Sequence, residues 1–280
     1  MKQKRCCGKQ KYWNNLPMKV IETDGIVLKT MDFKENDSIL TFLTPEAGKI
    51  AGVLHGGKSI RSGNSAKTEL FVTNHLEFSI KTGAELVRIR KCELLVSHAQ
   101  IRQNYSKFLH ACYLSELLLF CEIPVVESED YFNLLKRTIS QLSEFDNCAE
   151  IKLNFEIQLL KLLGIIPSLK SCTVCENFLW KENPGELMSP KYSIPHQLDS
   201  IQGGIRCPSC FVNSSYTSTL HPGCLSFLHN RISGRDNRFK IKPTQNNLKE
   251  LDQALNLYFS YFFGRNLKSY LLLKENSWGN

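Results

Sequence analysis

The hydrophobic period of the chain changes near residue 99, and this change limits the possible folds to a β-rich part followed by a helical part. From residue 20 to residue 97 the apolar residues form five short runs of period two, at 20–30, 38–44, 49–55, 69–80 and 85–97. After Ala99 the apolar spacing becomes helical, with further helical patterns at about 220–232 and 246–275. The sequence therefore predicts an α+β chain, with a five-stranded barrel at 18–98 and an α-helical domain at 99–280.

The net charge of +8 is placed unevenly along the chain. More than half of it lies in residues 1–17, where Lys2, Lys4, Arg5, Lys9 and Lys11 are accompanied by no acid. The remaining residues are only mildly basic, so an argument for nucleic-acid binding must rest on local patches. Because Met18 precedes the first strand pattern, we interpret 1–17 as a basic extension upstream of the native start. A nucleic-acid-binding arm is the alternative.

Neither a membrane span nor a secretory signal is indicated. The longest apolar stretch, residues 108–126, contains His110, Glu116 and Glu122, which would be costly at the centre of a bilayer. The basic N-terminal segment lacks the apolar region of a signal peptide. The eleven cysteines are odd in number and unevenly spaced, so we expect a reducing, cytoplasmic compartment and no disulfide framework.

Four of the cysteines are paired at the spacing of a zinc site. Cys172 and Cys175 form one C-x-x-C knuckle, and Cys207 and Cys210 form another after 31 intervening residues. Two such knuckles can close a tetrahedral site for one structural Zn²⁺ without an open coordination position. We expect this zinc module to occupy about residues 168–219, a loop-like segment rich in Gly and Pro.

Three other interpretations of these residues remain open. The four thiols could be reduced and free of metal, or His221 and Cys224 could substitute as ligands. The third alternative is a zinc deaminase, in which His75-Leu-Glu77 would supply the H-x-E motif for Cys207 and Cys210. That alternative leaves Cys172 and Cys175 without a role. We expect a protein without catalytic residues.

Basic residues are concentrated in and after the third predicted strand. No acid occurs between Glu46 and Glu69, and Arg88 and Arg90 alternate with Ile89 so that both point to one face of the last strand. A flexible cationic loop on a five-stranded barrel is typical of oligonucleotide binding, while the simpler alternative is a solvated polar face. A second basic cluster, Arg231, Arg235, Arg238, Lys240 and Lys242, could extend the surface. The candidate DNA-contact residues of the barrel are Lys49, Lys58, Arg61, Lys67, Arg88 and Arg90.

Several short motifs, in this order and spacing, resemble the RecO family of bacterial recombination mediators. In the N-terminal part they are Asp24–Lys29, Glu35-Asn-Asp37, Leu43–Lys49 and Gly56-Gly57 with Arg61-Ser62. In the remainder they are Phe155-Glu156, Leu163–Pro167, the two C-x-x-C knuckles, Gly203-Gly204 and Gly264–Ser269. The family's closing motif adds Lys268 to the candidate DNA-contact residues. His55 and Tyr270 stand where the family usually has a cation.

The resemblance implies an oligonucleotide-binding (OB) fold fused to a helical domain that carries the zinc module. It implies binding to single- and double-stranded DNA, annealing of complementary strands, and action in DNA damage repair by the RecF pathway. The implied partners are RecR and the single-stranded DNA-binding protein, from whose DNA complex RecO and RecR help to load RecA. The implied location is the bacterial cytoplasm, at the nucleoid. The alternative function is an RNA- or ribosome-associated factor with an OB-fold and a zinc site.

Overall fold

The computed structural model describes residues 19–58, 64–80, 86–181, 189–190, 193–234 and 242–277. The N-terminal extension, the candidate residue Arg61 and the three central members of the second basic cluster lie outside these ranges. The chain divides into two compact units, residues 1–98 with 122–133, and residues 99–121 with 134–280. None of the described helices is both long and apolar enough to cross a bilayer.

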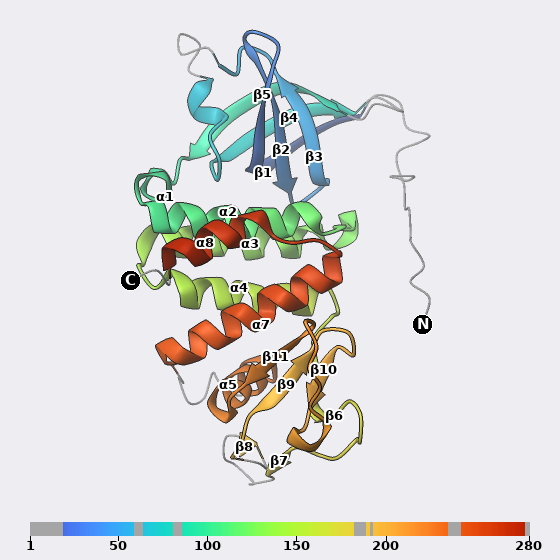
Figure 1. The fold of residues 1–280 in the computed structure, drawn as a ribbon. Coiled ribbons are helices and arrows are strands. Elements are labelled where there is room, and N and C mark those ends of the chain that lie inside the picture. The colour runs from blue at the N-terminus through green and yellow to red at the C-terminus, as the bar shows by residue number, and fades with distance from the viewer. Residues whose placement is uncertain are drawn as a thin grey trace. The chain divides into compact units, whose positions relative to one another are not determined.

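The first unit contains a closed five-stranded barrel with the strand order β1-β2-β3-β5-β4 (Figure 1). Its strands are β1 (Lys19–Phe33), β2 (Asp37–Thr44), β3 (Gly48–Leu54), β4 (Thr73–Ile80) and β5 (Val87–Val96). All neighbouring strands are antiparallel except β3 and β5, which are parallel and close the barrel. At this closure a Cβ on Gly52 would lie 2.8 Å from Val87 Cγ2, so only glycine allows the two strands to approach.

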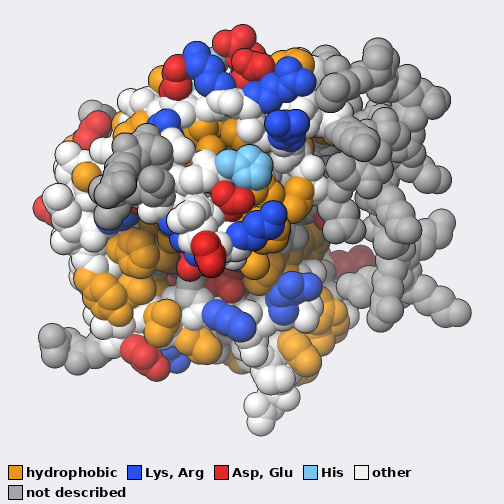
Figure 2. Space-filling view, turned by 90° about the horizontal axis from the view of Figure 1, so that it is seen from above, with side chains coloured by type: hydrophobic (Ala, Val, Ile, Leu, Met, Phe, Trp, Pro, Cys, Tyr) orange, Lys and Arg blue, Asp and Glu red, His pale blue; other side chains and the backbone are white. Residues whose placement is uncertain are grey.

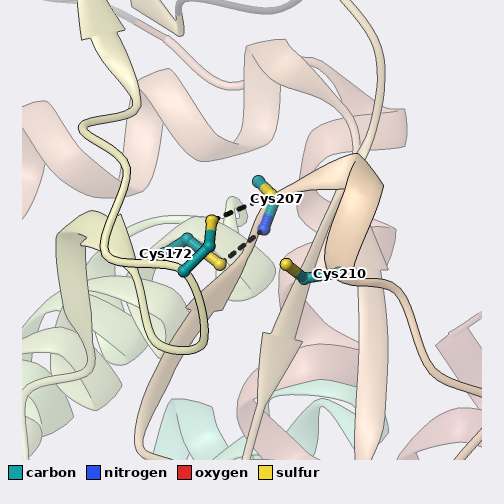
Figure 3. Close-up of side chains that lie close together, drawn as sticks. Cys172, Cys207 and Cys210 are labelled. Atoms are coloured by element: carbon teal, nitrogen blue, oxygen red, sulfur yellow. Dashed lines mark hydrogen bonds between the residues drawn. The ribbon is translucent and has the colours of Figure 1, made fainter.

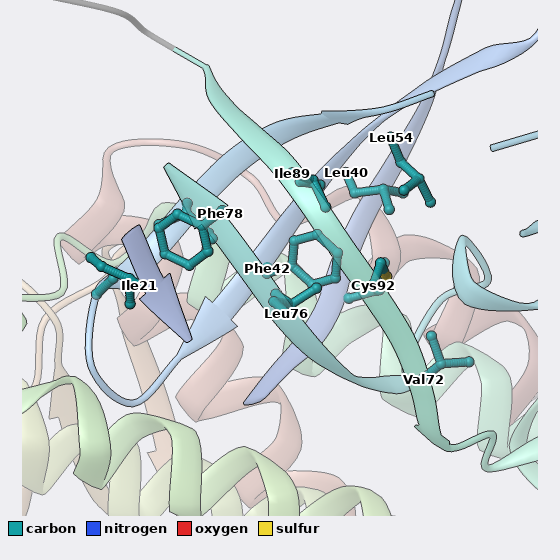
Figure 4. Packing of buried hydrophobic residues seen from close by; sticks show 12 residues of the cluster. Ile21, Leu40, Phe42, Leu54, Val72, Leu76, Phe78, Ile89 and Cys92 are labelled. Carbon is teal, nitrogen blue, oxygen red and sulfur yellow. The ribbon is translucent and has the colours of Figure 1, made fainter. Parts of the chain in front are cut away.

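The barrel interior is filled by side chains that alternate along each strand. In β3, for example, buried and half-buried residues alternate over its whole length. Phe42, Leu76, Phe78 and Ile89 point toward one another at the centre of this core (Figure 4). The side chains therefore fill the barrel interior.

The second unit is helical. It includes α1 (Ala99–Gln103), α2 (Tyr105–Phe120), α4 (Cys148–Leu162), α5 (Pro222–Ile232), α7 (Gln245–Phe263) and α8 (Lys268–Ser277). The helix α3 (Ser128–Glu144) begins among residues assigned to the first unit. Helix α2 packs against α4 and α8, and α7 packs against α4 and α5. The helical pattern at 246–275 is divided at Gly264, whose φ of +65° ends α7.

The segment after α4 forms a small sheet rather than the loop that its composition suggests. The strands β6 (Ser168–Cys172), β9 (His196–Asp199), β10 (Gly204–Arg206) and β11 (Thr217–Leu220) are arranged in the order β11-β9-β10-β6. A second pair consists of β7 (Trp180–Lys181) and β8 (Ser189–Pro190). The fold prediction is confirmed: a five-stranded barrel is followed by a helical region in which the four paired cysteines lie close together.

A buried ionic network joins four helices of the second unit. Lys152 Nζ lies 2.8 Å from Glu156 Oε1 and 2.8 Å from Asp252 Oδ1. Tyr113 OH donates to Glu156 at 2.5 Å, and Tyr270 OH donates to Asp252 at 2.9 Å. Burial alone would lower the pKa of Lys152, but the two carboxylates hold that pKa above its ordinary value. The lysine is therefore the charged counterion that allows both acids to be buried.

We predict that Lys152→Ala lowers the free energy of unfolding of the helical unit by about 3–5 kcal/mol, because two carboxylates would remain buried without a counterion. Urea unfolding followed by helical circular dichroism measures this change. The exposed Lys274, on α8, provides the matched control Lys274→Ala, which should stay within about 0.5 kcal/mol of the parent. Equal stabilities of the two variants would show that the network does not support the helices.

Candidate metal centre and nucleic-acid groove

The four paired cysteines converge from two turns of the small sheet. Cys172 ends β6 and Cys175 lies in the turn that follows, while Cys207 comes directly after β10 and Cys210 ends a one-turn 3-10 helix. All four Sγ atoms lie within 4.8 Å of one another, and those of Cys175 and Cys207 are 3.7 Å apart. A tetrahedral site with Zn–S bonds of about 2.3 Å requires sulfur separations of about 3.8 Å. The geometry therefore fits a single tetrahedral metal ion.

The backbone around Cys172 favours a thiolate. The amide groups of Cys207 and Val174 donate to Cys172 Sγ at 3.3 and 3.5 Å, and Figure 3 shows Cys172, Cys207 and Cys210 facing one another. Burial would raise the pKa of Cys172, but hydrogen bonds from these amides and that of Cys175 lower it to about 6. In contrast, the pKa of Cys210 is raised to about 12, first by its contact with the Cys207 thiol and then by burial. Four thiols this close cannot all ionise unless a cation joins them.

Two features of the sheet hold the second knuckle in place. Gly203 has a φ of +65°, and a Cβ on Gly204 would lie 2.7 Å from the carbonyl oxygen of Ser168. Asp199 Oδ1 accepts the amide hydrogens of residues 201 and 202, and its Oδ2 lies 2.6 Å from Arg206 Nε. The tight turn and the buried ion pair together bring β10 and Cys207 against β6.

The alternative ligands of the sequence lie elsewhere. His221 Nδ1 is 2.7 Å from Glu250 Oε1, and the thiol of Cys224 donates to Glu250 Oε2 at 3.0 Å. His75 lies on β4 of the barrel, between Glu22 and Asp24, and these carboxylates raise its pKa by hydrogen bonding. Among the described residues the metal-type cluster contains the four paired cysteines alone. The arrangement does not support the deaminase alternative.

A groove of about 740 Å³ opens beside β5, and its apolar lining residues belong to the barrel core. Its apolar residues are Leu54, Ile89 and Cys92, and its polar residues are His55, Asn64, Lys67, Arg88, Arg90, Lys91 and Glu93. Four permanent cations thus face one acid. Burial raises the pKa of the Cys92 thiol to about 11, so this cysteine is part of the apolar floor and not a nucleophile.

A β-bulge places an additional cation in this groove. The partner of Glu77 across the sheet is Lys91, whereas the partner of Phe78 is Ile89, so Arg90 is an extra residue in β5. Simple alternation would direct Lys91 toward the barrel interior with Ile89. The bulge exposes both Arg90 and Lys91 and buries Cys92 instead. Lys91 is a groove residue that the sequence pattern missed.

The edge of the groove is fixed by Asp37, from the Glu35-Asn-Asp37 motif. Asp37 Oδ1 accepts the amide hydrogen of Gly56 at 3.0 Å, and its Oδ2 lies 3.0 Å from His55 Nδ1. The Gly56 hydrogen bond is the main cause that lowers the pKa of Asp37. Two other lining residues are joined by a hydrogen bond, because Lys67 Nζ donates to Asn64 Oδ1 at 2.9 Å. The base of the basic loop is therefore held beside the cations of β5.

The structure brings together only some of the predicted DNA-contact residues. Lys67, Arg88 and Arg90 line the groove. Lys58 instead forms an ion pair of 3.2 Å with Asp32, Lys49 lies on β3 outside the groove lining, and Lys268 begins α8 in the second unit. The surface seen from above intersperses basic, acidic and apolar side chains rather than presenting one basic field (Figure 2). Any nucleic-acid contact thus depends on local grooves.

Comparison with known proteins identifies the family. Residues 18–98 match the family described as Recombination protein O N terminal, and residues 102–271 match Recombination protein O C terminal. The chain is 27% identical over 258 residues to "DNA repair protein RecO" of Syntrophus aciditrophicus, covering 91% of this chain and 95% of that protein. It is 28% identical over 254 residues to the protein of the same name from Symbiobacterium thermophilum, covering 90% and 96% of the two chains. The two family matches cover both parts of the sequence, and the relatives cover about nine-tenths of its length, in agreement with the resemblance of the motifs. The chain therefore belongs to the RecO family of DNA repair proteins.

Proposed function

We propose that this protein is a non-enzymatic recombination mediator that binds DNA through the outer groove of its barrel. The observation that carries the proposal is the groove itself, in which Lys67, Arg88, Arg90 and Lys91 surround an apolar floor. Proteins of this kind hold single strands by a cationic path for the phosphates and apolar or aromatic contacts for the bases. Phosphate contacts do not read sequence, so we expect binding with little sequence preference.

The cations in the groove differ in whether they already form an ion pair with a carboxylate, and so in how readily they can bind a phosphate. Lys91 Nζ lies 3.0 Å from Glu93 Oε1, and Arg90 Nη1 lies 3.9 Å from Glu77 Oε1. No described carboxylate lies within ion-pair distance of Arg88 or Lys67. Both of the paired cations are solvent-exposed, and exposed ion pairs contribute little, so a phosphate can displace their partners at low cost. Arg88 is therefore the cation whose contact with DNA should be the most direct.

We also propose the family's wider role for this chain. It would bind double-stranded as well as single-stranded DNA, anneal complementary strands, and act with RecR to load RecA onto DNA coated by the single-stranded DNA-binding protein. The proposed location is the cytoplasm, at the nucleoid. Support for this step comes from family membership and from the DNA repair name of the relatives. Annealing of strands coated with the single-stranded DNA-binding protein, with and without RecR, tests it directly.

The proposed metal is one structural Zn²⁺ held by Cys172, Cys175, Cys207 and Cys210. Four thiolates at tetrahedral separations are the donor set that zinc prefers in structural sites. Zinc would supply the positive charge that allows all four thiols to ionise and would link β6 to β10. With four protein ligands no position is left for substrate or water, so the site stabilises the fold.

We predict that the purified protein contains about one zinc ion per chain and that Cys207→Ser loses it, with several kcal/mol of local stability, because metal binding and folding are coupled. Metal analysis and thermal unfolding measure the two effects. Cys112, on α2 and outside the cluster, gives the matched control Cys112→Ser, which should retain the metal. Equal zinc contents in Cys207→Ser and the parent would disprove the assignment.

We predict that Arg88→Ala/Arg90→Ala weakens binding to single-stranded DNA of any sequence and reduces the slope of log affinity against log salt. The slope should fall by roughly 0.7 for each lost phosphate contact, because fewer counterions are released. Titrations at several salt concentrations measure the slope. The exposed Lys29 of β1 does not line the groove, so Lys29→Ala should keep the parent slope.

A folded double variant with an unchanged slope would exclude the groove as the DNA-binding surface. A competition titration of the parent protein distinguishes DNA binding from RNA binding. If RNA displaces single-stranded DNA of equal length from the parent protein, the RNA-associated alternative is favoured instead.

A further inference from the structure

Two neighbouring groups of aromatic rings are partly exposed on the second unit, on elements that the proposed groove does not use. We call this set the aromatic strip, and it consists of Tyr216, Tyr261, Phe262, Phe263 and Phe120. Tyr216 precedes β11, the next three rings are at the end of α7, and Phe120 ends α2. The exposed fractions of Tyr216, Tyr261 and Phe262 are 45%, 36% and 43%.

The rings contact one another edge to face. The Tyr216 and Tyr261 ring centroids are 5.5 Å apart, and those of Phe262 and Phe263 are 5.2 Å apart. Phe263 in turn lies 5.8 Å from Phe120. Tyr216, Tyr261 and Phe262 nevertheless remain partly exposed, and an exposed ring face can receive a planar partner.

The strip is fixed rigidly to the helical core. Phe259, which is completely buried, stacks on Phe263 with a centroid separation of 6.1 Å. The left-handed Gly264 then turns the chain, and the amide of Arg265 donates to the carbonyl of Ser260 at 3.0 Å. Rings that are already ordered lose little conformational entropy when a ligand stacks on them.

Two cations, Arg265 and Lys268, lie near the rings, and the neighbouring acid Glu116 already accepts hydrogen bonds from the backbone. The guanidinium of Arg265 lies over the Phe120 ring, 4.7 Å from its centroid. Glu116 accepts the amide hydrogens of Lys268 and Ser269, at 2.9 and 2.8 Å, and so caps the start of α8. The exposed side chain of Lys268 makes no ion pair with a described residue. The local charge near the strip is therefore positive.

We propose that the aromatic strip is a second binding surface for single-stranded DNA, on which unpaired bases stack while Arg265 and Lys268 meet the phosphates. Every base has a π-face, so such stacking is independent of sequence. Positive charge complements a polyanion, and an Arg beside the rings adds a cation–π contribution. In a duplex the base faces are covered by neighbouring pairs, so the strip should discriminate single strands from double strands. This inference rests on the proposed DNA binding but assigns it a different surface and a different contact.

The test compares Tyr261→Leu/Phe262→Leu with the parent in the full-length protein. Leucine keeps an apolar side chain of similar reach but cannot stack, so affinity for a dT oligonucleotide should fall at least about tenfold. The salt slope should stay unchanged because no phosphate contact is removed, and affinity for duplex DNA should also be unchanged. The matched control is Tyr105→Leu, which replaces a tyrosine of 61% exposure at the start of α2, outside the strip. This control should bind like the parent.

Unchanged dT affinity in a folded Tyr261→Leu/Phe262→Leu protein would overturn the inference. If the oligomeric state of that protein also changed by sedimentation, the strip would instead pack against a second copy. A parent protein that fails to bind single-stranded DNA would instead refute the proposed function. Groove variants that keep the salt slope of the parent would refute the groove as a DNA-binding surface.

Discussion

The helical unit depends on a single buried ammonium group. Lys152 is 2% exposed and is the counterion of Glu156 and Asp252, so it links α4 to α7 through their buried charges. The hydroxyl groups of Tyr113 and Tyr270 extend this network to α2 and α8. A buried charge without a partner is far more costly than a buried apolar side chain, so loss of any one of the three charges would destabilise this packing of the helices. The end of α7, which carries three rings of the aromatic strip, and the start of α8, which carries Lys268, derive their positions from that packing.

The binding groove of the barrel has a different origin, because side chains fill the barrel interior. The groove is shaped by a bulge in β5 and by a loop that is hydrogen-bonded to Asp37. The bulge turns two successive cations outward, and the anchored loop limits the groove on the other side. A closed barrel has no free strand edges, so local irregularities of this kind are a means of creating a binding groove without disturbing the core.

The parts of this architecture that depend on local sequence could be predicted, and the parts that depend on pairing could not. The five strands follow from period-two alternation, and the metal-type cluster follows from two C-x-x-C spacings. The sheet of β6, β9, β10 and β11 could not be predicted, because strands of three to five residues are too short to show a period. Lys91 was missed because the bulge shifts the phase of β5 by one residue. The ion pair of Lys58 with Asp32 likewise depends on pairing, since it joins residues that are far apart in sequence.

The central claim is that single-stranded DNA lies in the outer groove of the barrel. Ultraviolet cross-linking of a dT oligonucleotide to the full-length protein, followed by peptide mass spectrometry, tests that claim most directly. The account predicts that cross-linked peptides from the barrel contain residues 54–55, 64, 67 or 88–93, which line the groove. Efficient cross-linking with no peptide from these segments would contradict it.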